Sequence, residues 1–185
     1  MKRIQQPSNW QSGYSLIEVM AVLSITAILV GQAQPNLSHL YQIKQANHVS
    51  QQLIQLVKLT RSQAVNRSGR VTLCPSQDGE FCSKTWRQGI IVFADNNANG
   101  KRSIDEEILT VNNFIPPDSK LIWRAFGGSR YYLQYTSQGR TRSQNGRFSF
   151  CPSSNDKRYL QQIIINKPGR PRKAWPHERK LNHCQ

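Results

Sequence analysis

The sequence predicts an α+β protein in which one long amino-terminal helix packs on a β-rich antiparallel head. Over the first third of the chain, apolar residues recur at intervals of three and four, which is the period of a helix. After Gly69 the pattern changes to short runs rich in β-branched and aromatic residues, separated by turn-forming residues. Because no second long helical period follows, we expect these runs to pair as antiparallel strands against the helix.

The chain begins with a short polar leader, residues 1–13, which carries Lys2 and Arg3 and is followed by an apolar segment at 14–34. A helix from Tyr14 to Ala33 would have 20 residues and a length of about 30 Å, enough to span a bilayer. The basic leader is expected on the cytoplasmic side, which places everything after the segment outside. We therefore expect one membrane span and a periplasmic body.

Glu18 lies inside this apolar segment. A charged side chain deep in hydrocarbon costs about 2.5–3.5 kcal/mol on insertion scales, so such a residue usually has a partner. Two simple interpretations of residues 1–34 are an ordinary secretory signal peptide and a plain membrane anchor. The signal peptide is disfavoured because Glu18 interrupts the apolar run and no clean small-x-small cleavage site follows Val30.

Residues 35–68 are expected to continue the helix as an amphipathic segment that ends near Asn66, with Gly69 supplying a left-handed cap after Ser68. Its apolar face consists of Leu37, Leu40, Ala46, Val49, Leu53, Leu56, Val57 and Ala64. Residues 69–185 form the predicted head. Its expected strands are Arg70–Leu73, Gly89–Ala94, Glu107–Val111, Lys120–Ala125, Tyr131–Thr136, Arg147–Cys151 and Tyr159–Ile165.

Four cysteines in an exported body favour two disulfides. Three pairings are possible. We favour Cys74–Cys82, which would close a turn-rich loop, together with Cys151–Cys184, which would hold the tail and stabilise the fold by about 3–4 kcal/mol. A zinc site is disfavoured because the sequence has no CxxC pair.

One segment matches the spacing of a calcium-binding loop: Asp95, Asn97, Asn99, Gly100 and Glu106. However, a strand and not a helix is expected before Asp95, and Lys101 and Arg102 place two positive charges inside the loop. The same residue types also suit a tight turn. We expect a turn without a metal or other cofactor, while the calcium interpretation stays open.

We do not expect an enzyme. His39 and His48 fall on the long helix, and His177 and His183 fall in the tail. The sequence contains no pairing of a nucleophile with a base, no phosphate-cradling glycine loop and no metal-ligand spacing that would indicate catalysis.

Positive charge is concentrated in the last third of the chain. Residues 120–185 contain 14 Lys and Arg against 2 acidic residues, whereas residues 1–119 contain 11 against 8. A surface of this charge density attracts polyanions and binds phosphates by releasing condensed counterions, with little dependence on sequence. Double-stranded DNA is the polyanion that we expect outside a cell.

Within this basic third, an element suited to phosphate binding consists of Gly169, Arg170, Pro171 and Arg172. Gly169 lets the backbone turn and approach a phosphate, and Pro171 stiffens the segment. The arginines present planar forks that can hold phosphate oxygens in bidentate fashion. The basic track is extended by Lys167, Lys173, Arg179 and Lys180. A solvated tail, or contact with anionic lipid or an acidic neighbouring protein, are the alternatives.

The patch would widen if the fold brought further cations to the same side. The candidates are Arg124, Arg130, Arg140, Arg142, Arg147, Lys157 and Arg158.

The amino-terminal pattern resembles the class III signal of type IV pilins and type II secretion pseudopilins: a basic leader, Gly13, an apolar run after it and Glu18 five positions past the glycine. The resemblance implies that a prepilin peptidase cleaves between Gly13 and Tyr14 and methylates the new amino terminus. It also implies that Glu18 pairs with the terminal amine of a neighbouring subunit during assembly, and that the chain passes from the bacterial inner membrane into an extracellular pilus.

A second resemblance covers nearly the whole chain past Gly13. The runs VTLCPSQDGEFC, GIIVFADNNANGKRSIDEEIL, FCPSS and IIINKPGRPR resemble the GspH/FimT branch of minor pilins and pseudopilins, whose β-rich head usually has two small sheets. The Gly169–Arg172 element is similar to the DNA-binding element of FimT proteins that serve natural transformation. This resemblance implies a minor pilin that binds double-stranded DNA without sequence preference. The alternatives are a pilus-assembly subunit without a ligand and a minor pseudopilin of type II secretion.

Overall fold

The computed structural model describes residues 13–127, 129–141, 143–154 and 156–184, and within these the side chains of residues 32–36 and 183 lie outside the description. The predicted leader therefore lies outside the described residues except for Gly13. The chain divides into two compact units, Met1–Tyr41 and Gln42–Gln185.

One helix, α1 (Leu16–Asn66), contains 51 residues and belongs in part to each unit. In the first unit its described side chains are exposed, including Leu37 and Leu40 of the predicted apolar face. Within the described residues, no helix is both long and apolar enough to cross a membrane.

In the second unit, α1 buries the apolar face that its sequence predicts, from Ala46 to Ala64. The helix ends at Asn66, as expected, but its cap differs from the prediction. Ser68, and not Gly69, takes the left-handed conformation, with φ 49°. The Gly69 amide donates to the Ala64 carbonyl (3.2 Å) and the Ser68 amide donates to the Val65 carbonyl (3.1 Å). These are the two bonds of a Schellman motif, in which the left-handed residue is the one before Gly69.

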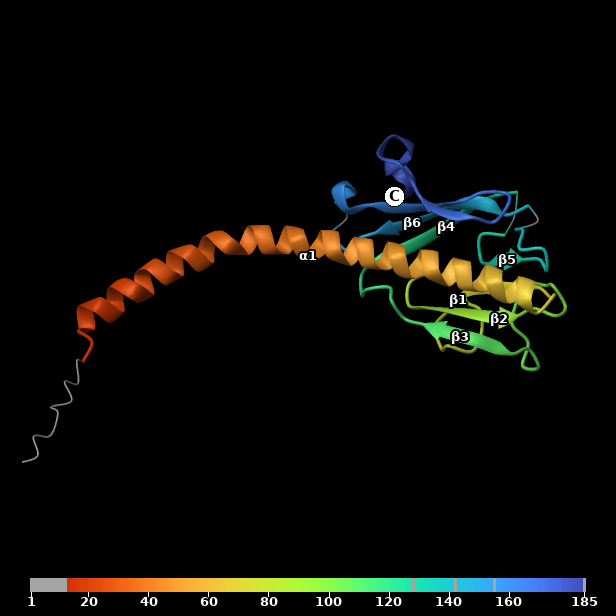
Figure 1. The fold of residues 1–185 in the computed structure, drawn as a ribbon, viewed down its shortest axis with the longest axis horizontal. Helices are drawn as coiled ribbons and strands as arrows, with labels where there is room; N and C mark the ends of the chain where they lie inside the picture. The colour runs from red at the N-terminus through yellow and green to blue at the C-terminus, as the bar shows by residue number, and fades with distance from the viewer. Residues whose placement is uncertain (1–12, 128, 142, 155, 185) are drawn as a thin grey trace, which may run out of the picture. The chain divides into compact units, whose positions relative to one another are not determined.

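The head consists of two four-stranded antiparallel sheets (Figure 1). The first has the order β3-β2-β1-β5 and is formed by β1 (Val71–Ser76), β2 (Gly89–Ala94), β3 (Ile108–Asn112) and β5 (Leu133–Tyr135). The second has the order β4-β6-β7-β8 and is formed by β4 (Lys120–Phe126), β6 (Asn145–Cys151), β7 (Gln161–Ile165) and β8 (Pro171–Lys173). Among the described residues of the head there are also three short 3-10 helices: η1 (Lys157–Tyr159), η2 (Pro176–Glu178) and η3 (Leu181–Cys184).

All seven predicted strands are present, with ends that differ by a few residues, and the α+β fold is confirmed. The eighth strand, β8, was not predicted. It begins at Pro171 inside the element predicted to bind phosphate, and it pairs with β7 as the edge of the second sheet. Proline is tolerated at the first residue of an edge strand because its missing N–H is not needed there.

A single main core joins α1 to both sheets. It includes Leu53 and Val57 of the helix, Leu73 of the first sheet and Phe148 of the second. Trp123 stacks on Phe148 with ring centroids 4.3 Å apart. Every buried residue of this core lies between Ala46 and Ile165. The fragment 42–185 therefore contains the complete core, and we expect it to fold without the first unit.

Two disulfides hold the ends of the head. Cys74 is bonded to Cys82 and Cys151 to Cys184, which is the pairing favoured from the sequence. The first bond closes the loop after β1, and the second ties η3 to the end of β6.

Candidate nucleic-acid interface

The predicted phosphate-binding element lies at the tight turn that joins β7 to β8. The Gly169 amide donates to the Asn166 carbonyl (2.8 Å), and the Arg170 amide donates to the Asn166 side-chain oxygen (2.7 Å). Gly169 has φ +81°, a conformation that glycine adopts without strain. A side chain at this position would also meet the ring of Tyr135, 2.5 Å away. The turn thus requires glycine here for two separate reasons.

Tyr135, from β5 of the other sheet, fixes the position of this turn. Its ring is fully buried, and its hydroxyl donates to the Gly169 carbonyl at 2.7 Å. Burial raises the pKa of Tyr135, so the hydroxyl stays protonated and keeps its role as a donor. The neighbouring loop adds a second contact, from the Thr141 hydroxyl to the Lys167 carbonyl (3.4 Å). The turn is therefore held from outside its own sheet.

Two cavities flank the turn, and cations line both. One, of about 530 Å³, lies between α1 and the start of β8 and is lined by Lys58, Arg61, Ser62, Val65, Asn66, Arg170 and Pro171. The other, of about 400 Å³, is lined by Thr136, Gln138, Arg140, Lys167 and Pro168. Neither described lining contains Asp or Glu. We call the five cations together the turn site: Lys58, Arg61, Arg140, Lys167 and Arg170.

The cations of the turn site come from three elements that the fold brings together. Arg61 is half-buried on α1, and its Nε donates to the Gly139 carbonyl at 2.8 Å, which holds the guanidinium in place. Lys167 and Arg170 are exposed on the turn. The Arg170 guanidinium has no hydrogen-bond or ion-pair partner among the described residues. Exposed guanidinium and ammonium groups of this kind are available to phosphate oxygens.

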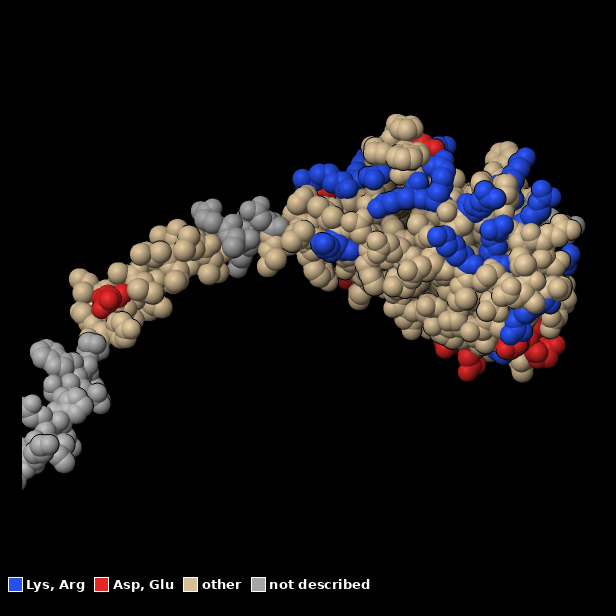
Figure 2. Space-filling model, viewed as in Figure 1, with Lys and Arg blue, Asp and Glu red and all other residues tan. Residues whose placement is uncertain are grey.

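Charge on the head is segregated, as Figure 2 shows. Lys and Arg gather over the part of the visible face formed by the second sheet and the adjoining α1, while Asp and Glu gather near the β3 edge. Clustered charge of one sign steers an oppositely charged ligand toward that surface.

The two arginines of the predicted element, Arg170 and Arg172, have different surroundings. Arg172 forms a bidentate ion pair with Glu178, with distances of 2.6 and 2.7 Å. Glu178 also accepts from the Trp175 amide (2.9 Å). The hydrogen bonds from Arg172 and Trp175 lower the pKa of Glu178 to about 2, so the carboxylate is ionised at any physiological pH. Only Arg170 of the pair is unpaired.

Three other cations of the predicted basic track, Lys173, Arg179 and Lys180, lie apart from the turn. The Lys173 ammonium donates to the side-chain oxygen of Asn47 on α1 (2.9 Å), and its pKa is lowered by partial burial and by nearby Arg179. Arg179 is half-buried, and the Lys180 backbone is paired with Gln162. The carboxyl-terminal tail is thus held in place by Gln162 of β7. Lys173, Arg179 and Lys180, like Arg172, do not line either cavity of the turn site.

Of the candidate cations that could widen the patch, Arg140 is part of the turn site. Arg124 lies on β4, at the opposite edge of the second sheet, Arg158 pairs with Asp156, and Arg142 lies outside the described residues. Lys58 and Arg61 were missed. Their three-residue spacing places both on one side of a helix whose opposite side is apolar. The sequence alone does not show that the β7–β8 turn packs beside them.

The segment with calcium-loop spacing is organised by hydrogen bonds of its own. Asp95 is buried and accepts from the Thr72 hydroxyl (2.7 Å) and the Gly100 amide (2.9 Å). Glu106, also buried, accepts from the Asn96 and Ser103 amides. Within the described chain, no group of three or more His, Cys, Asp or Glu side chains is placed to hold a metal ion.

At the amino-terminal end, Gly13, Tyr14 and Glu18 are exposed. Glu18 lies in the first turn of α1, where the partial positive charge of the helix terminus favours a carboxylate.

Comparisons with known proteins place the chain in a family. The family profile described as Type II transport protein GspH matches residues 49–169, and the prokaryotic N-terminal methylation motif matches residues 11–31. A search of curated protein sequences finds no significant match.

Among solved structures, the type IV minor pilin FimU of Pseudomonas aeruginosa is similar at 17% identity and a TM-score of 0.55, covering 75% of this chain and 92% of that one. The minor pseudopilin EpsH from the type II secretion system of Vibrio cholerae is similar at 13% identity and a TM-score of 0.51, covering 72% of this chain and 99% of that one. At such low identity these likenesses show the fold. Because the GspH profile spans well over half of the sequence and the methylation motif precedes it, the chain belongs to the GspH family.

Proposed function

We propose that this minor pilin binds extracellular double-stranded DNA through the turn site, so that the pilus can deliver the DNA for uptake in natural transformation. The observation that carries the proposal is the convergence of five cations from α1, the β5–β6 loop and the β7–β8 turn on two adjoining cavities without a carboxylate in their described linings. A strong local positive field of this kind has a polyanion as its natural ligand.

The composition of the turn site favours recognition of the phosphate backbone over the reading of bases. Duplex DNA carries one negative charge for about every 1.7 Å of its axis, so several cations can engage it at once. The linings of the two cavities contain no aromatic side chain among the described residues. Phosphate contacts position a protein on DNA without reading its sequence. The proposed binding is therefore independent of base sequence.

The test is a titration of the head fragment, residues 42–185, against a short fluorescent duplex followed by anisotropy. We expect binding that is the same for unrelated base sequences. Its log–log dependence on salt should have a slope of about −0.9 for each phosphate neutralised. If the fragment binds no duplex at low salt, DNA binding is wrong. The turn site would then be assigned to an acidic neighbouring protein, as in a pilus-assembly subunit or a type II secretion pseudopilin.

The amino-terminal end supports a separate proposal about processing. Minor pilins are structural proteins that associate with other pilins in a pilus or pseudopilus. We infer that prepilin peptidase cleaves this chain between Gly13 and Tyr14 at the inner membrane, and that Glu18 then pairs with the amino terminus of a neighbouring pilin. The match of the methylation motif to residues 11–31 supports this. A mass spectrum of the amino-terminal peptide should show N-methylated Tyr14, and an intact leader on the assembled protein would contradict the inference.

A further inference from the structure

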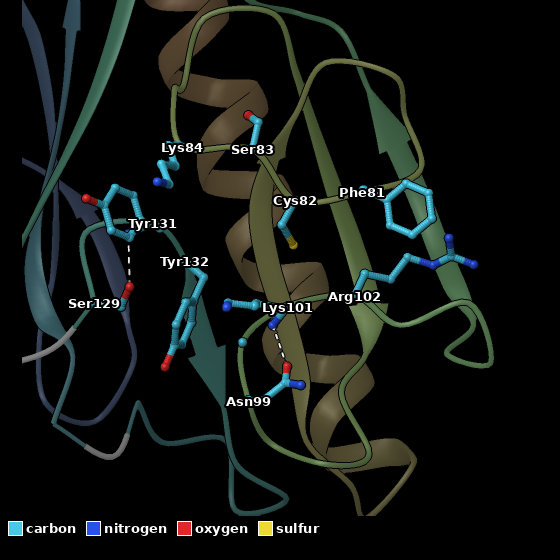
Figure 3. Close-up of a pocket in the computed structure, with 11 residues that line it drawn as sticks. Phe81, Cys82, Ser83, Lys84, Asn99, Lys101, Arg102, Ser129, Tyr131 and Tyr132 are labelled. Carbon is cyan, nitrogen blue, oxygen red and sulfur yellow. Dashed lines mark hydrogen bonds between the residues drawn. The ribbon is translucent and has the colours of Figure 1, made fainter.

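A pocket opens on the face of the first sheet that is turned away from α1. Side chains alternate along β1 and β2: Leu73 and Val92 join the main core with α1, whereas Cys74, Ile91 and Phe93 form a second cluster on the opposite face. Cys82 and Tyr132 pack on that second cluster and form the floor of the pocket. Its volume is about 330 Å³ (Figure 3). This is near the lower end of the range of about 300–1,000 Å³ for small-ligand sites.

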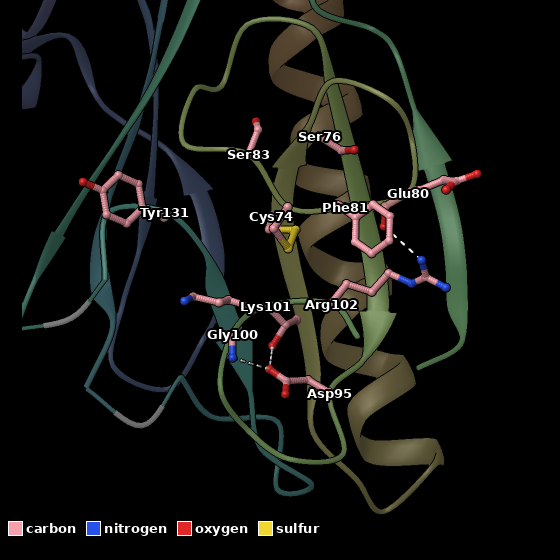
Figure 4. The surroundings of a disulfide bond; sticks show 12 residues. Cys74, Ser76, Glu80, Phe81, Ser83, Asp95, Gly100, Lys101, Arg102 and Tyr131 are labelled. Atoms are coloured by element: carbon pink, nitrogen blue, oxygen red, sulfur yellow. Dashed lines mark hydrogen bonds between the residues drawn. A yellow bond between two sulfur atoms is a disulfide. The ribbon is translucent and has the colours of Figure 1, made fainter. Parts of the chain in front are cut away.

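The loop that forms one wall is fixed in place. The Cys74–Cys82 disulfide closes it, with the Cα atoms 5.6 Å apart (Figure 4). Within the loop, the Asp78 carboxylate accepts from the Glu80 amide (2.8 Å) and the Phe81 amide (2.9 Å). The backbone that carries Phe81 is therefore preformed, and a ligand would not have to order it.

The second wall is the segment with calcium-loop spacing. Its buried carboxylates, Asp95 and Glu106, organise the backbone from within and leave Asn99 and Lys101 on the pocket side. The Lys101 amide donates to the Asn99 side-chain oxygen (2.7 Å). The carboxylates of this segment thus shape a wall and do not face the pocket, because neither of them lines it.

Aromatic rings and cations share the lining. Tyr131 is 51% exposed and Phe81 is 41% exposed, while Tyr132 is half-buried. Arg102 lies over the Phe81 ring, 5.4 Å from its centroid, and its Nε donates to the Glu106 carbonyl (3.1 Å). In Figure 3, Tyr131 lies at one side of the pocket and Phe81 with Arg102 at the other.

Two exposed lysines supply positive charge at this pocket. Lys84 and Lys101 are exposed, and their ammonium groups have no ion pair among the described residues. The described lining contains no Asp or Glu. A ligand that satisfies the pocket therefore has a flat apolar part for the rings and an anionic group for the lysines.

We propose that this pocket binds an unpaired nucleobase together with the phosphate next to it, as at a single-stranded end of DNA. The base stacks on Tyr131, and Lys84 and Lys101 contact the phosphate. Stacking on aromatic side chains with cations along the backbone is how proteins bind single strands without sequence preference. The site deepens the proposed DNA binding and rests on it for its biological meaning. It is nevertheless a separate surface, because it shares no lining residue with the turn site.

The experiment compares 5′-phosphorylated hexathymidylate, thymidine monophosphate and a blunt duplex as probes of the head fragment. Binding is followed by amide chemical shifts and by anisotropy. Hexathymidylate should shift the amide signals of Tyr131, Tyr132 and Lys101, and thymidine monophosphate should shift the same signals more weakly. Tyr131→Ala should lower hexathymidylate affinity about tenfold, the loss of one stacked base. The same change should leave affinity for the blunt duplex unaltered.

Phe126→Ala is the matched control, because Phe126 is exposed like Tyr131 but lies at the end of β4, outside the pocket lining. It should leave hexathymidylate affinity unchanged. The proposal is overturned if hexathymidylate moves no pocket signal, if inorganic phosphate alone moves them as strongly, or if an acidic polysaccharide binds the pocket and the oligonucleotide does not. Loss of duplex binding in a Lys167→Gln, Arg170→Gln variant that still binds hexathymidylate would separate failure of one site from failure of the other.

Discussion

Replacing both Lys167 and Arg170 with glutamine lowers the affinity of the head for duplex DNA about tenfold at about 0.15 M salt, and it makes the log–log salt slope shallower by about 2. These are the two cations that the β7–β8 turn presents between the two cavities. Each cation that no longer neutralises a phosphate removes the release of a condensed counterion. The thermal midpoint should hardly change, because both side chains are exposed and glutamine can occupy the same positions. Anisotropy titrations across a salt series measure the affinity and the salt slope, and a melting curve measures the thermal midpoint.

A matched control separates position from net charge. Lys120 and Arg124 are also one lysine and one arginine, both exposed, on β4 at the opposite edge of the same sheet. Changing them to glutamine removes the same charge and should reduce duplex affinity far less. Equal losses in the two double variants would mean that the whole head acts as a diffuse positive surface, and the turn site would have no special role.

The fold was predictable where local pattern and burial agree. Strands such as Gly89–Ala94 are fully buried apolar runs, and α1 buries the face that its periodicity indicates. β8 was not predictable because three residues that begin with proline carry no period, and the strand exists only through its pairing with β7. The cap of α1 was misassigned for a similar reason, since Ser68-Gly69 permits either residue to be left-handed.

The candidate site was predictable in part. The turn and its charges follow from residues adjacent in sequence, from Lys167 to Arg170. The contributions of Lys58 and Arg61 depend on the packing of α1 beside the turn, and Tyr135 reaches Gly169 from the other sheet. Such neighbours are set by tertiary structure, which a charge count does not contain. The ion pair of Arg172 with Glu178 likewise requires that η2 folds back on β8.

This ion pair leads to a second prediction, of the opposite sign: Glu178→Gln raises duplex affinity. In the parent protein, the Glu178 carboxylate accepts a hydrogen bond from each terminal nitrogen of the Arg172 guanidinium. It stays ionised because hydrogen bonds from Arg172 and Trp175 hold the pKa of Glu178 near 2. A neutral amide pairs far more weakly with a guanidinium, so Arg172 becomes available to a phosphate. We expect one additional phosphate contact, seen as a salt slope steeper by about 0.9 and an affinity several-fold higher.

Glu107→Gln provides the comparison that makes this result interpretable. Glu107 also holds an arginine, Arg67, in a bidentate pair, with distances of 2.7 and 3.0 Å, so its loss changes net charge and frees a guanidinium in the same way. Arg67, however, follows the end of α1 and pairs with the residue before β3, whereas Arg172 lies on β8, two residues after Arg170 of the turn site. If affinity rises equally in both variants, the gain reflects net charge alone. If affinity rises only with Glu178→Gln, the Glu178 carboxylate weakens DNA binding by competing with phosphate for Arg172. Arg172 would then contact DNA only when its ion pair with Glu178 is broken.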